Sequence, residues 1–192
     1  MQQGREHTLK AFDEDLDRLR ALISQMGGLA EHAIGEAMRC LMQRDVVAAL
    51  KISGVVERIG DYAKNIAKRV PLLENVGSIE PLSLLPEMAR IATEMVHNVL
   101  DAFVERDADA AVRVCERDQA VDDFYDSIFR TLLTHMMENP HNIGQSAHLL
   151  FVAKNLERVG DHATNIAEMV YYAATGDHMA DRIKNPVRGN QR

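Results

Sequence analysis

A short stretch of this chain, ERIGDYAKNIA at residues 57–67, is repeated almost unchanged as ERVGDHATNIA at residues 157–167. Around each copy, apolar residues recur at alternating steps of four and three, the spacing of one face of a helix in a bundle. The first copy places Ile52, Val56, Ile59, Ala63, Ile66 and Val70 on this face, and the second places Val152, Leu156, Val159, Ala163, Ile166 and Val170. The sequence therefore predicts two helical units related by duplication.

Composition favours an all-α fold. The 192 residues are 46% hydrophobic and 5% aromatic with no Trp, and the apolar residues are mostly types that helices tolerate well. Three prolines and a glycine between residues 71 and 86 mark a linker. We expect a first unit at 1–70, a linker at 71–86, a second unit at 87–176 and a polar tail at 177–192. The second unit should contain helices at about 83–106, 107–138 and 141–174.

The first unit is shorter than the second. A helix ends in QRD at Asp45 in the first unit and in ERD at Asp107 in the second, an offset of 62, whereas the repeated helix has an offset of 100. The difference, 100 minus 62, is 38 residues, enough for one helix and its turn. We expect the first unit to lack its middle helix near residues 45 and 46, which leaves about five long helices. Either a segment is absent from this sequence, which we favour, or the protein itself lacks it, and the apolar face at 52–70 then needs another cover.

Acidic side chains follow the repeated helix on the side opposite its apolar face. At 100° per residue, Glu57 and Asp61 lie on that side in the first copy, and Glu157 and Asp161 do so in the second. The preceding helix of the second unit carries another four-residue series, Asp118, Asp122 and Asp126. Two such helices packed side by side could bring together Asp118, Asp122, Glu157 and Asp161.

Oxygen ligands without His or Cys favour hard cations, namely Mg, Ca, Mn or ferric iron rather than zinc. The simpler interpretation is a solvated helix surface, on which Arg58 and Arg158 each pair with the Asp three residues on. The Glu, Gly, Asp and Asn positions recur in both copies, which favours a site. Gly60 and Gly160 each cost about 1 kcal/mol in a helix, so either a ligand or a tightly packed helix should approach the backbone there.

Charge and cysteine content limit the possible functions. The formal net charge is -7 with a pI of about 5.6, so nucleic acid is not expected as a partner. No apolar run approaches the length of a membrane span. Cys40 and Cys115 lie apart in helical patterns without a zinc or redox motif. We therefore expect a cytoplasmic location.

Three stretches resemble the PhoU family, the accessory proteins of phosphate-specific transport. They are HTLKAFDEDLDRLRALISQMGGLAEHAI at the start, AALKISGVVERIGDYAKNIAKRV in the first repeated helix and MMENPHNIGQSAHLLFVAKNLERVGDHATNIAEMV in the second. The resemblance extends from His7 to Gly176 and implies two tandem three-helix bundles. It also implies that a Glu-or-Asp-x-x-x-Asp motif on two helices of each bundle binds a metal cluster, with iron preferred and Mn, Mg or Zn as alternatives.

The family motif transfers residue by residue to this chain. It matches Glu57 and Asp61 in the first unit, and in the second it matches Asp118, Asp122, Glu157 and Asp161. Without a middle helix, the first pair lacks its partners. We therefore place the functional site in the second unit.

The resemblance implies a cytoplasmic, non-enzymatic negative regulator of phosphate uptake and of the phosphate-starvation response. Such a protein is an adaptor between the ATPase subunit of a phosphate ABC transporter and a sensor histidine kinase; it reaches the membrane only through these partners and forms homodimers. One alternative is a carboxylate-bridged metal enzyme of the di-iron oxidase or phosphatase type, although the Glu-x-x-His spacing of Glu94 and His97 has no second helical copy. The other is a histidine phosphotransfer bundle using one of His32, His97, His135, His148 and His162.

Overall fold

The computed structural model describes residues 14, 16–29, 46–73 and 83–180. Residues 16–29 are helical, and they are followed by α2 (Val46–Ala67), α3 (Leu84–Glu105), α4 (Ala108–Glu138) and α5 (Ile143–Thr175). Short 3-10 turns occupy Val70–Leu72 (η1) and Pro140–Asn142 (η3). No strand occurs within these ranges, and the predicted all-α class is confirmed.

The three helices of the second unit begin and end close to the predicted positions. Ser83 precedes α3, and Arg106 ends it in a left-handed conformation with φ 54°. The Asp107 carboxylate then accepts a hydrogen bond from the backbone N–H of Ala110 and caps α4. Gly176 ends α5 with φ 77°, where a residue without Cβ is favoured.

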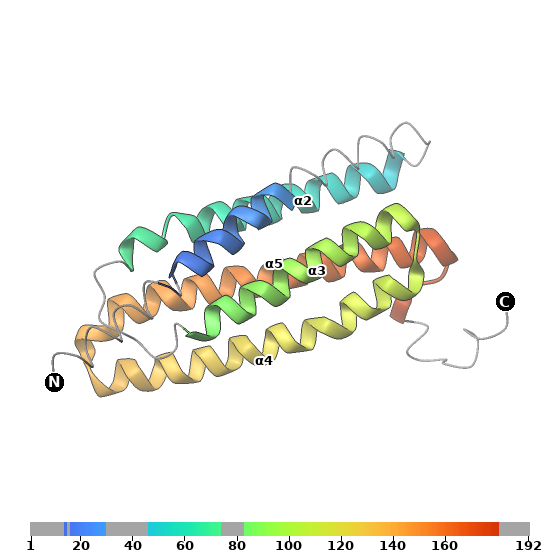
Figure 1. The fold of residues 1–192 in the computed structure, drawn as a ribbon. Coiled ribbons are helices and arrows are strands. Elements are labelled where there is room, and N and C mark those ends of the chain that lie inside the picture. The colour runs from blue at the N-terminus through green and yellow to red at the C-terminus, as the bar shows by residue number, and fades with distance from the viewer. Residues whose placement is uncertain (1–13, 15, 30–45, 74–82, 181–192) are drawn as a thin grey trace.

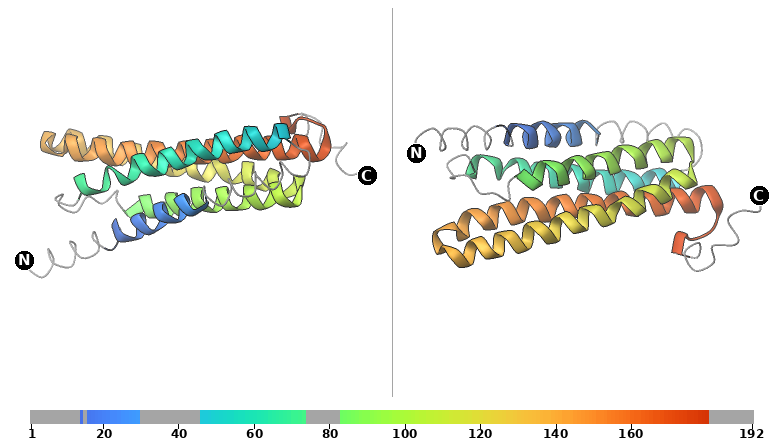
Figure 2. Two further views of the ribbon diagram at one scale, coloured as in Figure 1. Left: turned by 90° about the horizontal axis from the view of Figure 1, so that it is seen from above. Right: turned by 60° about the horizontal axis from the view of Figure 1, so that its bottom comes forward.

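The helices form three layers. Figures 1 and 2 show α4 on one side of the molecule, α3 and α5 in the middle, and α2 with residues 16–29 on the other side. Contacts join Tyr62 to His162 and Arg69 to His148, so α2 and α5 run antiparallel. The two copies of the repeated helix are therefore packed against each other.

The apolar face of the repeated helix is buried in both copies. On α2 the buried side chains are Ile52, Val56, Ile59, Ala63 and Ile66, and on α5 they are Val152, Leu156, Val159, Ala163, Ile166 and Val170, none of them more than 4% exposed. The α2 face shares its core with Leu16, Leu19, Ile23 and Met26 of the N-terminal segment and with α3 and α5. The short first unit thus has a cover for its apolar face within the chain.

Some predictions concern parts of the chain outside the described ranges. The expected loss of a helix near residues 45 and 46 lies at the edge of residues 30–45, and most of the linker and of the polar tail is also outside. The boundaries of the two units therefore stay predictions. Among the described helices, none combines the length and apolar character needed to cross a bilayer.

Candidate functional site

The acidic residues of the second unit lie along the contact between α4 and α5. A Cβ built on Gly160 would lie 2.8 Å from Asp118 Oδ1 and 3.5 Å from Val121 Cγ1. The missing side chain therefore lets α4 approach the α5 backbone closely. Of the two explanations for this glycine, helix packing is the one observed, and the atom placed against it is a carboxylate oxygen.

Close packing changes the protonation of these acids. Burial, followed by the negative charges of Asp122, Asp161 and Glu157 in that order of effect, raises the pKa of Asp118 to about 6. Burial, followed by Glu157 and Asp161, also raises the pKa of Asp122. Asp118 Oδ1 is buried and has no hydrogen-bond partner among the described residues. The four predicted acids of the second unit thus act on one another electrostatically.

One cation lies within this acidic group. The Lys154 ammonium pairs with Glu157, which is 16% exposed, and lies 4.9 Å from the centroid of the Tyr125 ring. This hydrogen bond raises the pKa of Lys154. Within the described ranges, no three His, Cys, Asp or Glu side chains are arranged so that they could hold a metal ion. The acids lie near one another, but their side chains are not arranged as a metal-coordination site.

The helical wheel places the acids of both copies opposite the apolar face, and the structure agrees. Glu57 and Asp61 are exposed on α2. Glu157 is half-buried at the contact of α5 with α4, where the sequence predicted that it would meet Asp118 and Asp122. Glu57 and Asp61 belong to no three-residue metal-ligand group in the described parts of the chain.

The contact between α2 and α5 contains Tyr62, which the sequence analysis did not select, beside His162, which it selected only as a possible phosphoryl acceptor. The rings of Tyr62 and His162 are stacked with centroids 5.4 Å apart, and the Tyr62 hydroxyl lies 3.2 Å from His162 Nε2. The Arg158 guanidinium lies over the Tyr62 ring at 5.9 Å. These rings occupy equivalent positions in the two repeats, so the offset of 100 was the signal that could have revealed their contact.

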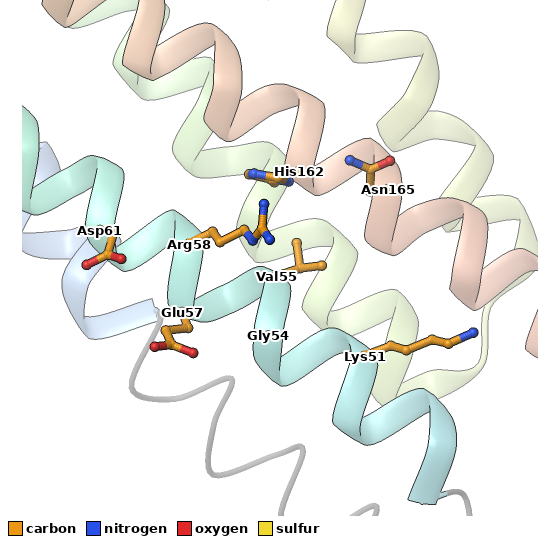
Figure 3. Close-up of a pocket in the computed structure, with 8 residues that line it drawn as sticks. All are labelled: Lys51, Gly54, Val55, Glu57, Arg58, Asp61, His162 and Asn165. Atoms are coloured by element: carbon orange, nitrogen blue, oxygen red, sulfur yellow. The ribbon is translucent and has the colours of Figure 1, made fainter.

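The ion pairs that the simpler interpretation allowed, Arg58 with Asp61 and Arg158 with Asp161, are not among the ion pairs of the described residues. Arg158 lies instead at the aromatic stack, and Figure 3 shows Arg58 directed toward His162. A guanidinium beside an aromatic ring gains a cation–π attraction that competes with a solvated carboxylate.

A groove of about 670 Å³ lies beside this stack, between α2 and α5. Its lining comes from six residues of α2 and two of α5: Lys51, Gly54, Val55, Glu57, Arg58, Asp61, His162 and Asn165. Figure 3 shows Glu57 and Asp61 extending from the side of α2 that faces away from His162. The groove therefore has cationic and amide groups toward α5 and carboxylates on its far side.

The other histidine and di-iron candidates have structural partners. His97 Nδ1 lies 3.0 Å from Asp101, and Glu94 pairs with Arg90. His148 Nδ1 lies 3.0 Å from the Arg69 guanidinium. His135 contacts Asn142 at 3.0 Å, and His32 is outside the described residues. None of these contacts indicates a phosphoryl acceptor or an inward-facing iron ligand.

Comparison with known proteins identifies the relatives of this chain. The PhoU domain family model matches residues 9–70 and 85–170. A phosphate-specific transport system accessory protein PhoU homolog from Zymomonas mobilis is 48% identical over 219 residues, covering 93% of this chain and 92% of the relative. A PhoU homolog of the same description from Caulobacter vibrioides is 36% identical, covering 92% and 95%.

Solved structures support the same relationship. The crystal structure of PhoU from Pseudomonas aeruginosa matches with a TM-score of 0.68 and 30% identity, covering 91% of this chain and 97% of that one. The phosphate transport system regulatory protein PhoU from Streptococcus pneumoniae matches in fold with a TM-score of 0.67, at 21% identity over 91% and 98% of the two chains.

The Zymomonas alignment also contains a length difference. It runs over 219 positions, whereas 93% of 192 residues is about 179, so the relative has about 40 positions without a counterpart here. That difference is close to the 38 residues obtained from the repeat offsets. The comparison gives the size of the length difference but not its position in the sequence. That the absent segment is the middle helix of the first unit stays a prediction.

Proposed function

This chain belongs to the PhoU family, and from that premise we propose that it is an accessory protein of phosphate-specific transport that represses phosphate uptake and the phosphate-starvation response. The observation that carries the proposal is 48% identity to a PhoU homolog, with more than nine-tenths of each chain covered. The names of the relatives describe accessory or regulatory proteins, and none describes an enzyme.

The proposed role is that of an adaptor. In the cytoplasm, a homodimer of this chain would bind the ATPase subunit of a phosphate ABC transporter and a sensor histidine kinase, and would reach the membrane through them. Long helices with charged outer faces suit such a role because they offer extended surfaces without a catalytic pocket. The cations of α2 beside α5, Lys51 and Arg58, and the acids at the α4–α5 contact give different parts of the surface different charge.

We further propose that the α4–α5 acids hold a hard metal cation or cluster, with iron first among the candidates. The support is chemical: Asp118, Asp122, Glu157 and Asp161 offer only oxygen ligands, and Asp118 Oδ1 is buried without a partner. Burial and then the neighbouring acids raise the pKa of Asp118, and a bound cation would neutralise the repulsion among these acids. For Glu157 to serve as a ligand, Lys154 would have to release it.

A complementation assay tests the regulatory role. A host whose own PhoU gene is deleted would carry this chain and a phosphate-starvation reporter. We expect the chain to restore repression in high phosphate and release it in low phosphate. Reporter activity that stays high in high phosphate, with the protein present at normal levels, would reject the proposal.

Elemental analysis tests the metal site. The purified chain should contain a stoichiometric metal that is lost in the double variant Asp122→Ala, Glu157→Ala. The matched control is Glu57→Ala, Asp61→Ala, which removes the equivalent acids from α2 and should leave most of the metal in place. Equal metal content in all three proteins would rule out the α4–α5 site.

A further inference from the structure

We propose that the groove between α2 and α5 binds inorganic phosphate. Its donors are the Lys51 ammonium and the Arg58 guanidinium from α2, together with the His162 imidazole and the Asn165 amide from α5. These four side chains come from both repeats and line one cavity of about 670 Å³. The groove is separate from the α4–α5 acids.

Among the described residues, the two cations of the groove have no carboxylate partner. Neither Lys51 nor Arg58 forms an ion pair with another described residue. Both lie on one face of α2, seven residues apart, with Gly54 between them. A Cβ added at Gly54 would meet nothing within 4 Å, so the floor of the groove between the cations is open. Unpaired cations flanking an open floor favour an anionic ligand.

His162 adds a second, independent observation. Its Nε2 is engaged with the Tyr62 hydroxyl at 3.2 Å, while its Nδ1 is buried and has no hydrogen-bond partner in the described structure. When Tyr62 donates its proton to Nε2, the neutral ring carries its own proton on Nδ1. A buried donor without an acceptor is uncommon in proteins. Because Nδ1 has almost no exposed surface, an oxyanion seated in the groove would become that acceptor through a shift of the ring on binding.

The carboxylates of the groove do not oppose this assignment. Glu57 and Asp61 also line it, but Figure 3 shows them extending away from His162, while Arg58 is directed toward it. The side of the groove near α5 therefore has positive charge and N–H donors. A tetrahedral oxyanion matches these donors because it can accept several hydrogen bonds at once.

The residues of the groove support an anion site. The choice of phosphate among tetrahedral oxyanions rests on the proposed function. Isothermal titration of the purified chain with inorganic phosphate, at constant ionic strength, tests the site. The substitution Arg58→Gln should weaken phosphate binding at least about tenfold, the effect of one lost charge-assisted hydrogen bond. Lys51→Gln should act in the same direction.

The chain contains a matched control. Arg158 is the repeat counterpart of Arg58 but lies over Tyr62 outside the groove lining, so Arg158→Gln should keep phosphate affinity within about twofold. Equal losses in Arg58→Gln and Arg158→Gln, or no binding by the unmodified chain up to about 10 mM phosphate, would overturn the site. Sulfate and glycerol phosphate are the comparison ligands, and equal or stronger binding of either one would overturn the assignment to the free phosphate ion.

This titration and the reporter assay fail independently. The titration uses the purified chain without a transporter or kinase, so a negative result leaves the regulatory proposal standing. Conversely, a chain that binds phosphate in the groove but does not restore repression would contradict the regulatory role and support the site.

Discussion

At Gly160 the backbone of α5 passes so close to Asp118 that a methyl group would overlap its carboxylate. Gly54 is also a mid-helix glycine, on α2, but it has open space around it. At Gly54 a substitution would test only the low helix propensity of glycine, whereas at Gly160 it would also test the steric need for a residue without a side chain. This difference gives the first prediction.

We expect Gly54→Ala to raise the free energy of unfolding by about 0.5–1 kcal/mol, because alanine is the better helix former. Gly160→Ala gains the same helix preference, but it must displace Asp118 and should lower the free energy of unfolding by about 1 kcal/mol. Urea unfolding of both variants measures the difference. If Gly160→Ala were as stabilising as Gly54→Ala, the close packing of α4 on α5 would be contradicted.

The raised pKa of Asp118 predicts a pH dependence of stability in metal-free protein. Its pKa of about 6 in the folded protein exceeds the ordinary aspartate pKa of 3.8, so between these values the folded state binds more protons than the unfolded state. The free energy of unfolding should therefore fall as pH rises from about 4 to about 6, by about 1 kcal/mol because solvent screens this partly exposed group. Urea unfolding across this range, with a chelator present, measures the decline.

Asp118→Asn should remove that decline, since the amide is neutral throughout, and should raise stability at pH 7 by about 1 kcal/mol. Asp123→Asn is the control, because Asp123 is exposed on the same helix. It should leave the pH profile unchanged. An identical profile in Asp118→Asn and the unmodified chain would show that Asp118 does not titrate differently on folding.

At the scale of whole helices, the contact of α2 with α5 depends on residues near the end of α2. The Arg69 guanidinium lies 4.2 Å from the centroid of the Phe151 ring and 3.0 Å from His148 Nδ1. Arg69→Ala should weaken this contact by about 1 kcal/mol and speed amide hydrogen exchange in the last turns of α2. The neighbouring Lys68 is exposed, and in Lys68→Ala the amide hydrogens of these turns should exchange at the rate of the unmodified chain. Equal exchange rates in the two variants would mean that Arg69 does not stabilise the packing of α2 on α5.

Sequence patterns predicted the helices better than the contacts between them. Local signals such as the Asp107 cap and Gly176 mark helix ends, so the limits of α3, α4 and α5 could be read directly. A helical wheel assigns one buried direction, so it does not show how far Glu157 is covered by the contact of α5 with α4. The stacking of Tyr62 on His162 depends on how the two repeats pack, which neither copy encodes alone.

For the whole molecule, the two copies of the repeated helix share one apolar core within the described ranges. The contacts of α3, α4 and α5 with one another complete a three-helix unit, whereas the apolar face of α2 shares its core with α5. We therefore expect the two halves to depend on each other, and the second half to be the more stable of the two when it is made alone.

This arrangement predicts different outcomes for the two halves when each is made separately. Residues 83–180 should be helical and unfold cooperatively, but at a lower temperature than the full chain, because α5 loses the cover of α2. Residues 1–73 should be largely unfolded, since side chains such as Ile59 and Ile66, each worth about 1.5–3 kcal/mol when buried, would lose much of their apolar surroundings. Circular dichroism with thermal melts distinguishes the fragments. A cooperative melt of 1–73 would show that the first half folds without α5, and the shared core would then not determine the stability of the molecule.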